Sequence, residues 1–523
     1  MKQLLFPVKA ILRILTALLI AVTITGCSAL ENSKTEPAPD LPHSERPSPA
    51  RILPDNVPEE DGQSTTPGDQ SVQTVASSTN TAPANPEPEL YQIDLPTALR
   101  LASAQNYKIA VAVEKIAEAS AQVDRSKVLL LPTVAVGASY NRHEGQIQET
   151  DGNVLDINRS ARYAGLGTGA VGAGTIQIPG VSLIVDLEDA FFEPLAARQN
   201  ALAAKAGARA VTNQVLLDVS VSYYQLVHAK AALAIAEETR QNASYLAKLT
   251  ESFAKTGEGL ESDAERAAVE ELLRERELQR AREVFQVQSV RLAELLHLGA
   301  KIQLDPSDKD VVPIHIVAAD RSLSDLIDAA LLNHPEVKQR QALADRAFER
   351  FRKIKHGPLI PKVALNLSAG NFGGESSSSG GRSDYDAMIY WQFTFGDEAH
   401  TREHRSVYQQ ARLEQLGAVD RIASEVAQAH AHVESLGKQI ASSVSAVERA
   451  LRSLQLNRTR IYQKQGLPIE VLQAIQSLEI TRRLALDTVI DYNQAQFRLY
   501  TALGQPPSET ISKTPKVNKS IAE

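Results

Sequence analysis

The chain has 523 residues, a formal net charge of -8 and 5% aromatic residues, and Ala and Leu are its most frequent residues. This composition favours long helices over several compact domains. The acidic balance, without a basic patch of interleaved aromatic residues, argues against a nucleic-acid partner. The single cysteine excludes an intramolecular disulfide.

Residues 1–26 have the pattern of a secretory signal: a basic start, the apolar run 11–24 and a small residue, Gly26, before Cys27. Ile-Thr-Gly-Cys resembles the bacterial lipoprotein signal, in which the cysteine is lipidated and becomes the new N-terminus. An ordinary signal peptide, or a membrane anchor that happens to contain a cysteine, is the alternative. Ser28 stands where a lipoprotein kept at the inner membrane would have Asp, so the resemblance implies the outer membrane.

The segment 27–89 is crowded with Pro, Ser, Thr, Asn and acidic residues and has few apolar ones. Such a composition cannot bury enough surface to fold. We predict a disordered tether that carries the lipidated Cys27 away from the folded body. The tail 508–523 is predicted to be flexible. No segment after the signal approaches the roughly 20 apolar residues that a membrane-spanning helix needs.

The first folded unit is predicted at 90–305, and it begins with a helix. Apolar residues at helical spacing run from about 95 to 131, and Pro132 ends the helix. Apolar and polar residues then alternate in 134–141 and again in 181–187. This period of two predicts two strands, each with one apolar face.

The strands of this unit are separated by a predicted polar loop at 143–159 and a Gly-rich segment at 165–174. After Pro194 a helical pattern continues until it breaks at 256–259. Such a helix is far longer than those of a compact domain. A return helix then runs to Gly299, so the unit ends in a long helical hairpin.

After a predicted linker at 306–321, the same order of elements returns in a second unit, 322–507. A helix leads to strands predicted at 363–369 and 389–395, which a Gly/Ser loop at 373–381 separates. The second strand is rich in aromatic residues. The design of each unit is therefore helix, strand, loop, strand and long helical hairpin.

The second helical hairpin turns at Gly466, which we match with Gly257, and ends at Gly504, which we match with Gly299. In its return helix, small and apolar residues recur at alternating steps of three and four, the spacing of a coiled-coil seam. The seam consists of Val471, Ala474, Leu478, Thr481, Ala485, Thr488, Tyr492, Ala495, Leu499 and Ala502. The charged residues beside it are interpreted as solvated: Glu470, Arg482, Arg483, Asp487 and Asp491.

Four strands cannot cross a membrane alone, because an open sheet leaves unpaired edges in lipid, but several chains can close one barrel. The strand entries read LPTV and IPKV, the second hairpin turn reads G-x-x-x-EVLQA, and the return helices end in LLHLG and TALG. In this order, and with the order of elements occurring twice, these motifs resemble the TolC family of outer-membrane efflux proteins over residues 90–507.

The resemblance implies a mainly helical homotrimer with a membrane β-barrel. Twelve strands, four from each chain, would form the barrel, which stands on a long α-helical coiled-coil barrel in the periplasm. The function implied is the outer-membrane exit duct of a tripartite efflux or type I secretion system, without a cofactor. The duct would contact outer-membrane lipid and join an inner-membrane transporter through a periplasmic adaptor protein. The hairpin tips would dock these partners through Gly257, Gly259, Gly466, Leu467 and Pro468.

The family's periplasmic constriction is ringed by acidic residues just after the second tip. The resemblance places Glu470 at the first acidic position, while Gln473 replaces the second. Three Glu470 side chains around one axis would raise one another's pKa and attract cations. The alternative is that Glu470 is simply a first-turn acid favoured by the helix dipole.

One motif suggests a rival chemistry. His400, Glu403 and His404 fit H-x-x-E-H, the pattern of inverted zinc proteases. They stand at the start of a long polar helix, with no evident third ligand, so a solvated helix face is the preferred interpretation. His430 and His432 are two positions apart and fall on different faces. We expect no catalysis and no metal site.

The alternative of another class is an outer-membrane lipoprotein that acts as a coiled-coil scaffold without conducting. A scaffold does not need an alternating, aromatic-rich strand such as 389–395, which is typical of a membrane-facing surface. The sequence therefore favours a conducting protein.

Overall fold

The computed structural model describes residues 89–131, 133–135, 137–165, 181–299, 301–308, 310–318, 320–373 and 380–507. All of these fall in one compact unit, Pro83–Glu523. The predicted signal, Cys27, the tether up to residue 88, most of the Gly-rich segment at 165–174 and the tail lie outside the described residues.

Two pairs of short helices precede the long ones. They are α2 (Leu95–Gln105) with α3 (Tyr107–Lys127), and α6 (Leu323–Asn333) with α7 (Pro335–His356). The single helix predicted from about 95 to 131 is wrong, because Asn106 interrupts it. The backbone of Asn106 is extended, and its side-chain oxygen accepts a hydrogen bond from the Lys108 N–H at 2.9 Å. This is the geometry of a helix N-cap. The 3-10 turns η1 (Val128–Leu130) and η2 (Gly357–Leu359) follow α3 and α7.

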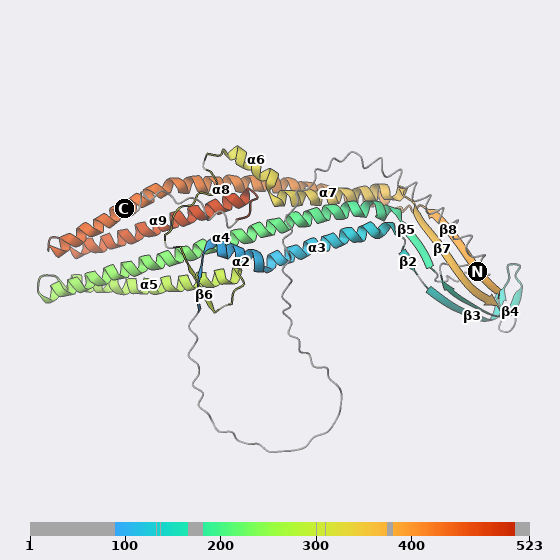
Figure 1. Ribbon diagram of the computed structural model, residues 1–523, viewed down its shortest axis with the longest axis horizontal. Helices are drawn as coiled ribbons and strands as arrows, with labels where there is room; N and C mark the ends of the chain where they lie inside the picture. The colour runs from blue at the N-terminus through green and yellow to red at the C-terminus, as the bar shows by residue number, and fades with distance from the viewer. Residues whose placement is uncertain are drawn as a thin grey trace, which may run out of the picture. The chain divides into compact units, whose positions relative to one another are not determined.

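Two long helical hairpins make up most of the structure (Figure 1). They are α4 (Leu187–Lys255) with α5 (Glu261–Leu295), and α8 (Asp397–Tyr462) with α9 (Pro468–Ala502). The 69 residues of α4 extend about 100 Å. This helix begins before the predicted start at Pro194, because the Asp186 side chain caps the N–H groups of Glu188 and Asp189. Pro194 removes one backbone hydrogen bond from a very long helix, which tolerates it.

The sheet has six antiparallel strands. They are β2 (Thr133–Ala135), β3 (Gly137–Gln148), β4 (Val154–Gly165), β5 (Val181–Asp186), β7 (Lys362–Gly373) and β8 (Gly380–Tyr390). β7 pairs with β5 along its first half and with β4 along its second half, so β5 and β4 follow one another along one edge of β7. β8 takes the other edge, while β2 pairs with β5 and β3 pairs with β4. The strands therefore form four rows.

The prediction of a polar loop at 143–159 is wrong, because most of these residues form the β3–β4 hairpin. The ladder runs without interruption from Gly137↔Gly165 to Gln148↔Val154. Backbone hydrogen bonds hold this hairpin, so neither strand needs an apolar face. Gly152 turns the chain with φ +94, next to an Asp, which is a typical hairpin sequence.

The strand predicted at 389–395 is also wrong in its limits. β8 ends at Tyr390, which pairs with Lys362, the first residue of β7. Beyond that pair β7 offers no partner, so the chain leaves the sheet. The aromatic side chains that follow are exposed: Trp391, Phe393 and Phe395.

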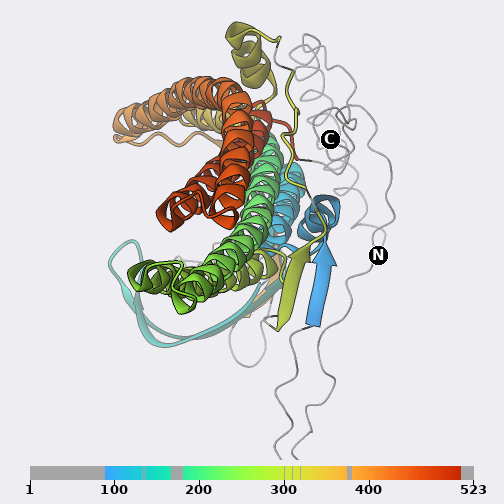
Figure 2. The same cartoon turned by 90° about the vertical axis from the view of Figure 1, so that its left-hand side faces the viewer.

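A second, two-stranded parallel sheet joins β1 (Glu89–Ile93) to β6 (Ile302–Pro306), seen side by side in Figure 2. The predicted linker begins at the end of β6, and α9 holds part of it in place. The buried Asn493 side chain accepts from the Ile314 N–H and donates to the Val312 carbonyl, both at 2.9 Å. The linker is therefore fixed to the second hairpin.

The main hydrophobic core lies where α2, α4, α5 and α9 meet. Its largest fully buried side chains include Tyr223, Leu226, Leu292 and Phe497. The predicted seam of α9 is buried or half-buried along its whole length, which confirms that prediction. In the described part of the chain, no helix has a stretch long and apolar enough to cross a membrane.

Candidate functional site

The first hairpin tip lies between α4 and α5. Gly257 has φ +72, a left-handed conformation that favours glycine. Gly259 packs against the preceding helix, since a Cβ on it would lie 2.9 Å from the Phe253 Cβ. Both predicted tip glycines therefore serve the turn.

The second tip reaches the same geometry with different residues. Its left-handed residue is Lys464, with φ +60, and Gly466 packs closely on Ile461 and Arg460. Gly466 thus corresponds to Gly259, and matching it with Gly257 was wrong. The match paired one glycine with another, because Lys464 carries no sequence signal for a left-handed backbone.

Three predicted tip residues of the second hairpin begin or precede α9. Leu467 is 60% exposed, and Pro468 is the first helical residue. The Lys464 Nζ lies 2.7 Å from the Glu258 carboxylate of the first tip. An ion pair therefore joins the two tips.

The Glu470 carboxylate makes local contacts in the described chain. It accepts from the Leu467 N–H at 3.4 Å and lies 3.2 Å from the Arg460 guanidinium of α8. These contacts fit the role of a first-turn acid. Gln473 is exposed, one turn further along α9. A role for either residue in a constriction stays a prediction.

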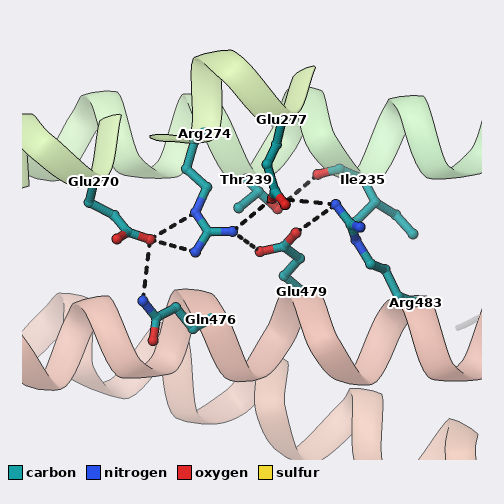
Figure 3. A network of polar contacts seen from close by, with 8 residues as sticks. All are labelled: Ile235, Thr239, Glu270, Arg274, Glu277, Gln476, Glu479 and Arg483. Atoms are coloured by element: carbon teal, nitrogen blue, oxygen red, sulfur yellow. Dashed lines mark hydrogen bonds and ion pairs between the residues drawn. The ribbon is translucent and has the colours of Figure 1, made fainter. Parts of the chain in front are cut away.

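A network that sequence reasoning missed lies further along the hairpins (Figure 3). Arg274 of α5 is 14% exposed and contacts three carboxylates. Its Nε lies 2.8 Å from Glu270, its Nη1 lies 3.0 Å from Glu277, and it also bonds Glu479 of α9. Arg483 of α9 lies 2.8 Å from Glu479 and 3.5 Å from Glu277. The network thus connects α5 to α9.

The charges of this network are not balanced, since three carboxylates face two guanidinium groups. Burial raises the pKa of the Glu479 carboxyl, although Arg274 and Arg483 act to lower it. Glu479 is 6% exposed, so it depends on these two partners for its charge.

Of the charged residues beside the α9 seam, Asp487 and Asp491 are exposed as predicted, whereas Glu470, Arg482 and Arg483 are half-buried. Arg482 bonds Glu238 of α4, and Asp487 lies 2.6 Å from the His228 Nε2. Together with Arg483, they attach α9 to the first hairpin. The sequence signal for these contacts was the repetition of opposite charges at one-turn spacing on α5 and α9.

The return helices end against the short helices. At the end of α5, the Leu295 carbonyl accepts from the Asn106 side chain at 3.3 Å, and the His297 Nε2 accepts from the Tyr107 N–H at 3.4 Å. At the end of α9, a Cβ on Gly504 would lie 2.9 Å from the His334 Cα. Counted from the helix ends, Gly504 corresponds to His297, so matching it with Gly299 was wrong.

No protein-family model matches the sequence, and no curated protein matches it. Solved structures do match. The outer membrane protein VceC from Vibrio cholerae is 18% identical, with a TM-score of 0.63, over 79% of this chain and 96% of VceC. The outer membrane channel CmeC from Campylobacter jejuni is 14% identical, with a TM-score of 0.66, over 80% and 88% of the two chains. The open state of the Neisseria gonorrhoeae outer membrane channel MtrE is 19% identical, with a TM-score of 0.62, over 79% and 90%. This chain has the outer-membrane channel fold.

The shared fold confirms the coarser part of the expectation from the sequence resemblance, a mainly helical chain with the fold of outer-membrane channels. It covers nearly the whole of VceC, so it includes sheet, long hairpins and short helices together. The chain is mainly helical, as predicted.

Proposed function

We propose that this protein is an outer-membrane exit duct that passes substrates from an inner-membrane pump across the periplasm and the outer membrane. The observation that carries the proposal is the outer-membrane channel fold, shared over 96% of VceC and 90% of MtrE. The protein acts as a conduit rather than an enzyme.

The duct is a homotrimer in this proposal. The four strand rows support it, because within the described residues the outer edges of β8 and of β2–β3 pair with no other strand. Edges of this kind require a partner before a sheet can enter lipid. Three chains with four rows each would supply the twelve strands that the TolC resemblance implies.

A tandem repeat underlies the chain in this proposal, with units at 90–305 and 322–507. Equal lengths of α5 and α9, at 35 residues each, support it. So does the order of two short helices, strands and a long hairpin in both halves. Lipidated Cys27 would anchor the chain to the outer membrane through the tether at 27–89.

The two hairpin tips are the proposed docking point for a periplasmic adaptor and the inner-membrane transporter. Their exposed residues, such as Leu467, support this role. Glu470 is the proposed constriction residue, and Arg460 would partly neutralise its charge at 3.2 Å.

Single-channel conductance of the purified protein in planar bilayers tests both the duct and the constriction. We expect a cation-preferring pore from the parent, and a wider or less selective pore from Glu470→Ala. Asp263→Ala is the matched control, because Asp263 is the third residue of α5 as Glu470 is the third of α9. A pore that both substitutions leave unchanged would keep the duct and reject the ring. If intact trimers form no pore, the non-conducting scaffold becomes the better proposal.

A further inference from the structure

The H-x-x-E-H motif lies in the first two turns of α8, where the proposed duct gives it no role. His400 is the fourth residue of the helix, and His404 follows one turn later. Residues four apart share one helix face. The two imidazole rings confirm this placement, with centroids 4.8 Å apart and an angle of 71° between their planes.

The two rings differ in their surroundings. His400 is exposed, while His404 is half-buried on the side of α8 that faces α7. Tyr408, one turn after His404, contacts Phe348 and Phe351 of α7, which fixes the orientation of this face. Both histidines therefore lie on α8, and His404 is on the face that packs against α7.

The pair has charged neighbours. Arg350 and Lys353 are cationic side chains that act on His404, whereas Glu403 is acidic. A neutral imidazole keeps the nitrogen lone pair that a metal ion needs. Arg350 and Lys353 repel any metal cation, so binding depends on the two imidazole nitrogens.

We propose that His400 and His404 bind one divalent transition-metal ion, with copper(II) preferred over nickel(II) and zinc(II). Imidazole nitrogen suits these three ions, and the preference follows their general order of affinity. Water completes the coordination, since within the described residues no group of three or more His, Cys, Asp or Glu residues could hold a metal. Calcium and magnesium are excluded, because they need several oxygen ligands.

The same helix supplies a matched control. His430 and His432 also belong to α8, but they lie two positions apart, on different faces. They match the proposed site in composition and helix, but cannot bind one ion together. Any affinity that depends merely on histidine content would include them.

Copper(II) titration of the full-length, tag-free protein in detergent tests the proposal, with electron paramagnetic resonance as the readout. We expect one ion per chain with the signature of two nitrogen ligands. His400→Gln and His404→Gln should each weaken binding at least tenfold, whereas the double variant His430→Gln/His432→Gln should bind as the parent does. Magnesium should not compete.

Two results would overturn the proposal: unchanged copper binding in His400→Gln, or equal loss in the His430→Gln/His432→Gln variant. Since His404 is half-buried, the elution volume and helical circular dichroism of His404→Gln confirm that it is folded. The exposed His400 gives a variant that does not depend on this control.

Discussion

The two helical hairpins have helices of similar length, but they place glycine and non-glycine residues at opposite ends. In each hairpin, the residue two positions after the end of each helix has a left-handed backbone. In the α4–α5 hairpin these residues are Gly257 at the tip and His297 at the return end. In the α8–α9 hairpin they are Lys464 at the tip and Gly504 at the return end. Each hairpin thus pays the steric strain of one non-glycine residue, at opposite ends.

The reversal shows that two different needs select these residues. At Gly504 there is no space for a side chain, whereas nothing lies within 4 Å of a Cβ added at Gly257. At the other two positions the side chain is used. His297 accepts from the Tyr107 N–H, and Lys464 pairs with Glu258 of the other tip. At these two positions a non-glycine residue therefore adopts the left-handed conformation, and its side chain reaches another helix or the other tip.

The contact between the hairpins should respond most strongly to substitution. Arg274→Met would leave the buried Glu479 without its main partner, and we expect the free energy of unfolding to fall by about 4 kcal/mol. Loss of helical circular dichroism on heating measures this as a lower midpoint. The exposed Arg276 on the same helix is the control, since Arg276→Met should change the midpoint little. Equal midpoints for the two variants would show that the network does not stabilise the hairpin contact.

The space around Gly504 gives the second largest effect. Gly504→Ala should cost about 3 kcal/mol, since it combines left-handed strain with overpacking against His334. Gly257→Ala should cost about 1 kcal/mol, because it adds left-handed strain alone. The same thermal unfolding measurement compares them. If Gly257→Ala proved as costly as Gly504→Ala, strain rather than space would explain both glycines.

Sequence periodicity predicted the long helices and their turns, because a helix depends on residues near one another in the chain. It failed where a neighbouring strand determines the limits of a strand. β8 ends at Tyr390 because β7 begins at Lys362, and no residue of the aromatic run 389–395 reveals that limit. The β3–β4 hairpin was missed because its strands are polar, although an Asp-Gly turn signal was present.

The positions of the hairpin turns were predictable from the sequence, while the functional roles of the tips and of Glu470 stay predictions. The tips and Glu470 follow from the break in the helical pattern and from the TolC resemblance. The Arg274 network does not, since Glu270 and Glu479 belong to different hairpins and each by itself is typical of a solvated helix face. Ion pairs between residues far apart in the sequence can be identified only once the packing of α5 against α9 is known.

A smaller effect is expected at Lys464. Lys464→Gly removes the left-handed strain of about 1 kcal/mol, but glycine gains more freedom in the unfolded chain. We expect a net stabilisation of about 0.5 kcal/mol, visible as a slightly higher midpoint. Lys464→Ala keeps the strain and removes the exposed pair with Glu258, so it should not stabilise. A gain in both variants would assign the effect to the lost side chain instead of the backbone.

The smallest effect should appear at acid pH, where the two short-helix caps differ. Asn106 caps α3, while at α7 the His334 Nδ1 accepts from the Glu336 N–H at 3.3 Å. Burial lowers the pKa of His334, and Arg421 lowers it too, against the raising effect of Glu336. The unfolded chain, with a histidine pKa of about 6.5, therefore binds more protons than the folded chain as the pH falls below that value. The contribution of His334 to stability is complete above about pH 6.5 and is lost as the pH falls through its lower folded pKa.

His334→Asn isolates this contribution, because it places at α7 the cap that α3 already uses. We expect the parent to lose more stability than His334→Asn when unfolding is compared between pH 7.5 and pH 5. Other titrating groups act on both proteins and cancel in the comparison. Parallel pH profiles would mean that His334 acts as a cap whose charge is irrelevant. A steeper profile in the parent would instead show that the cap of α7 weakens on acidification, because protonation of the His334 Nδ1 removes the acceptor for the Glu336 N–H.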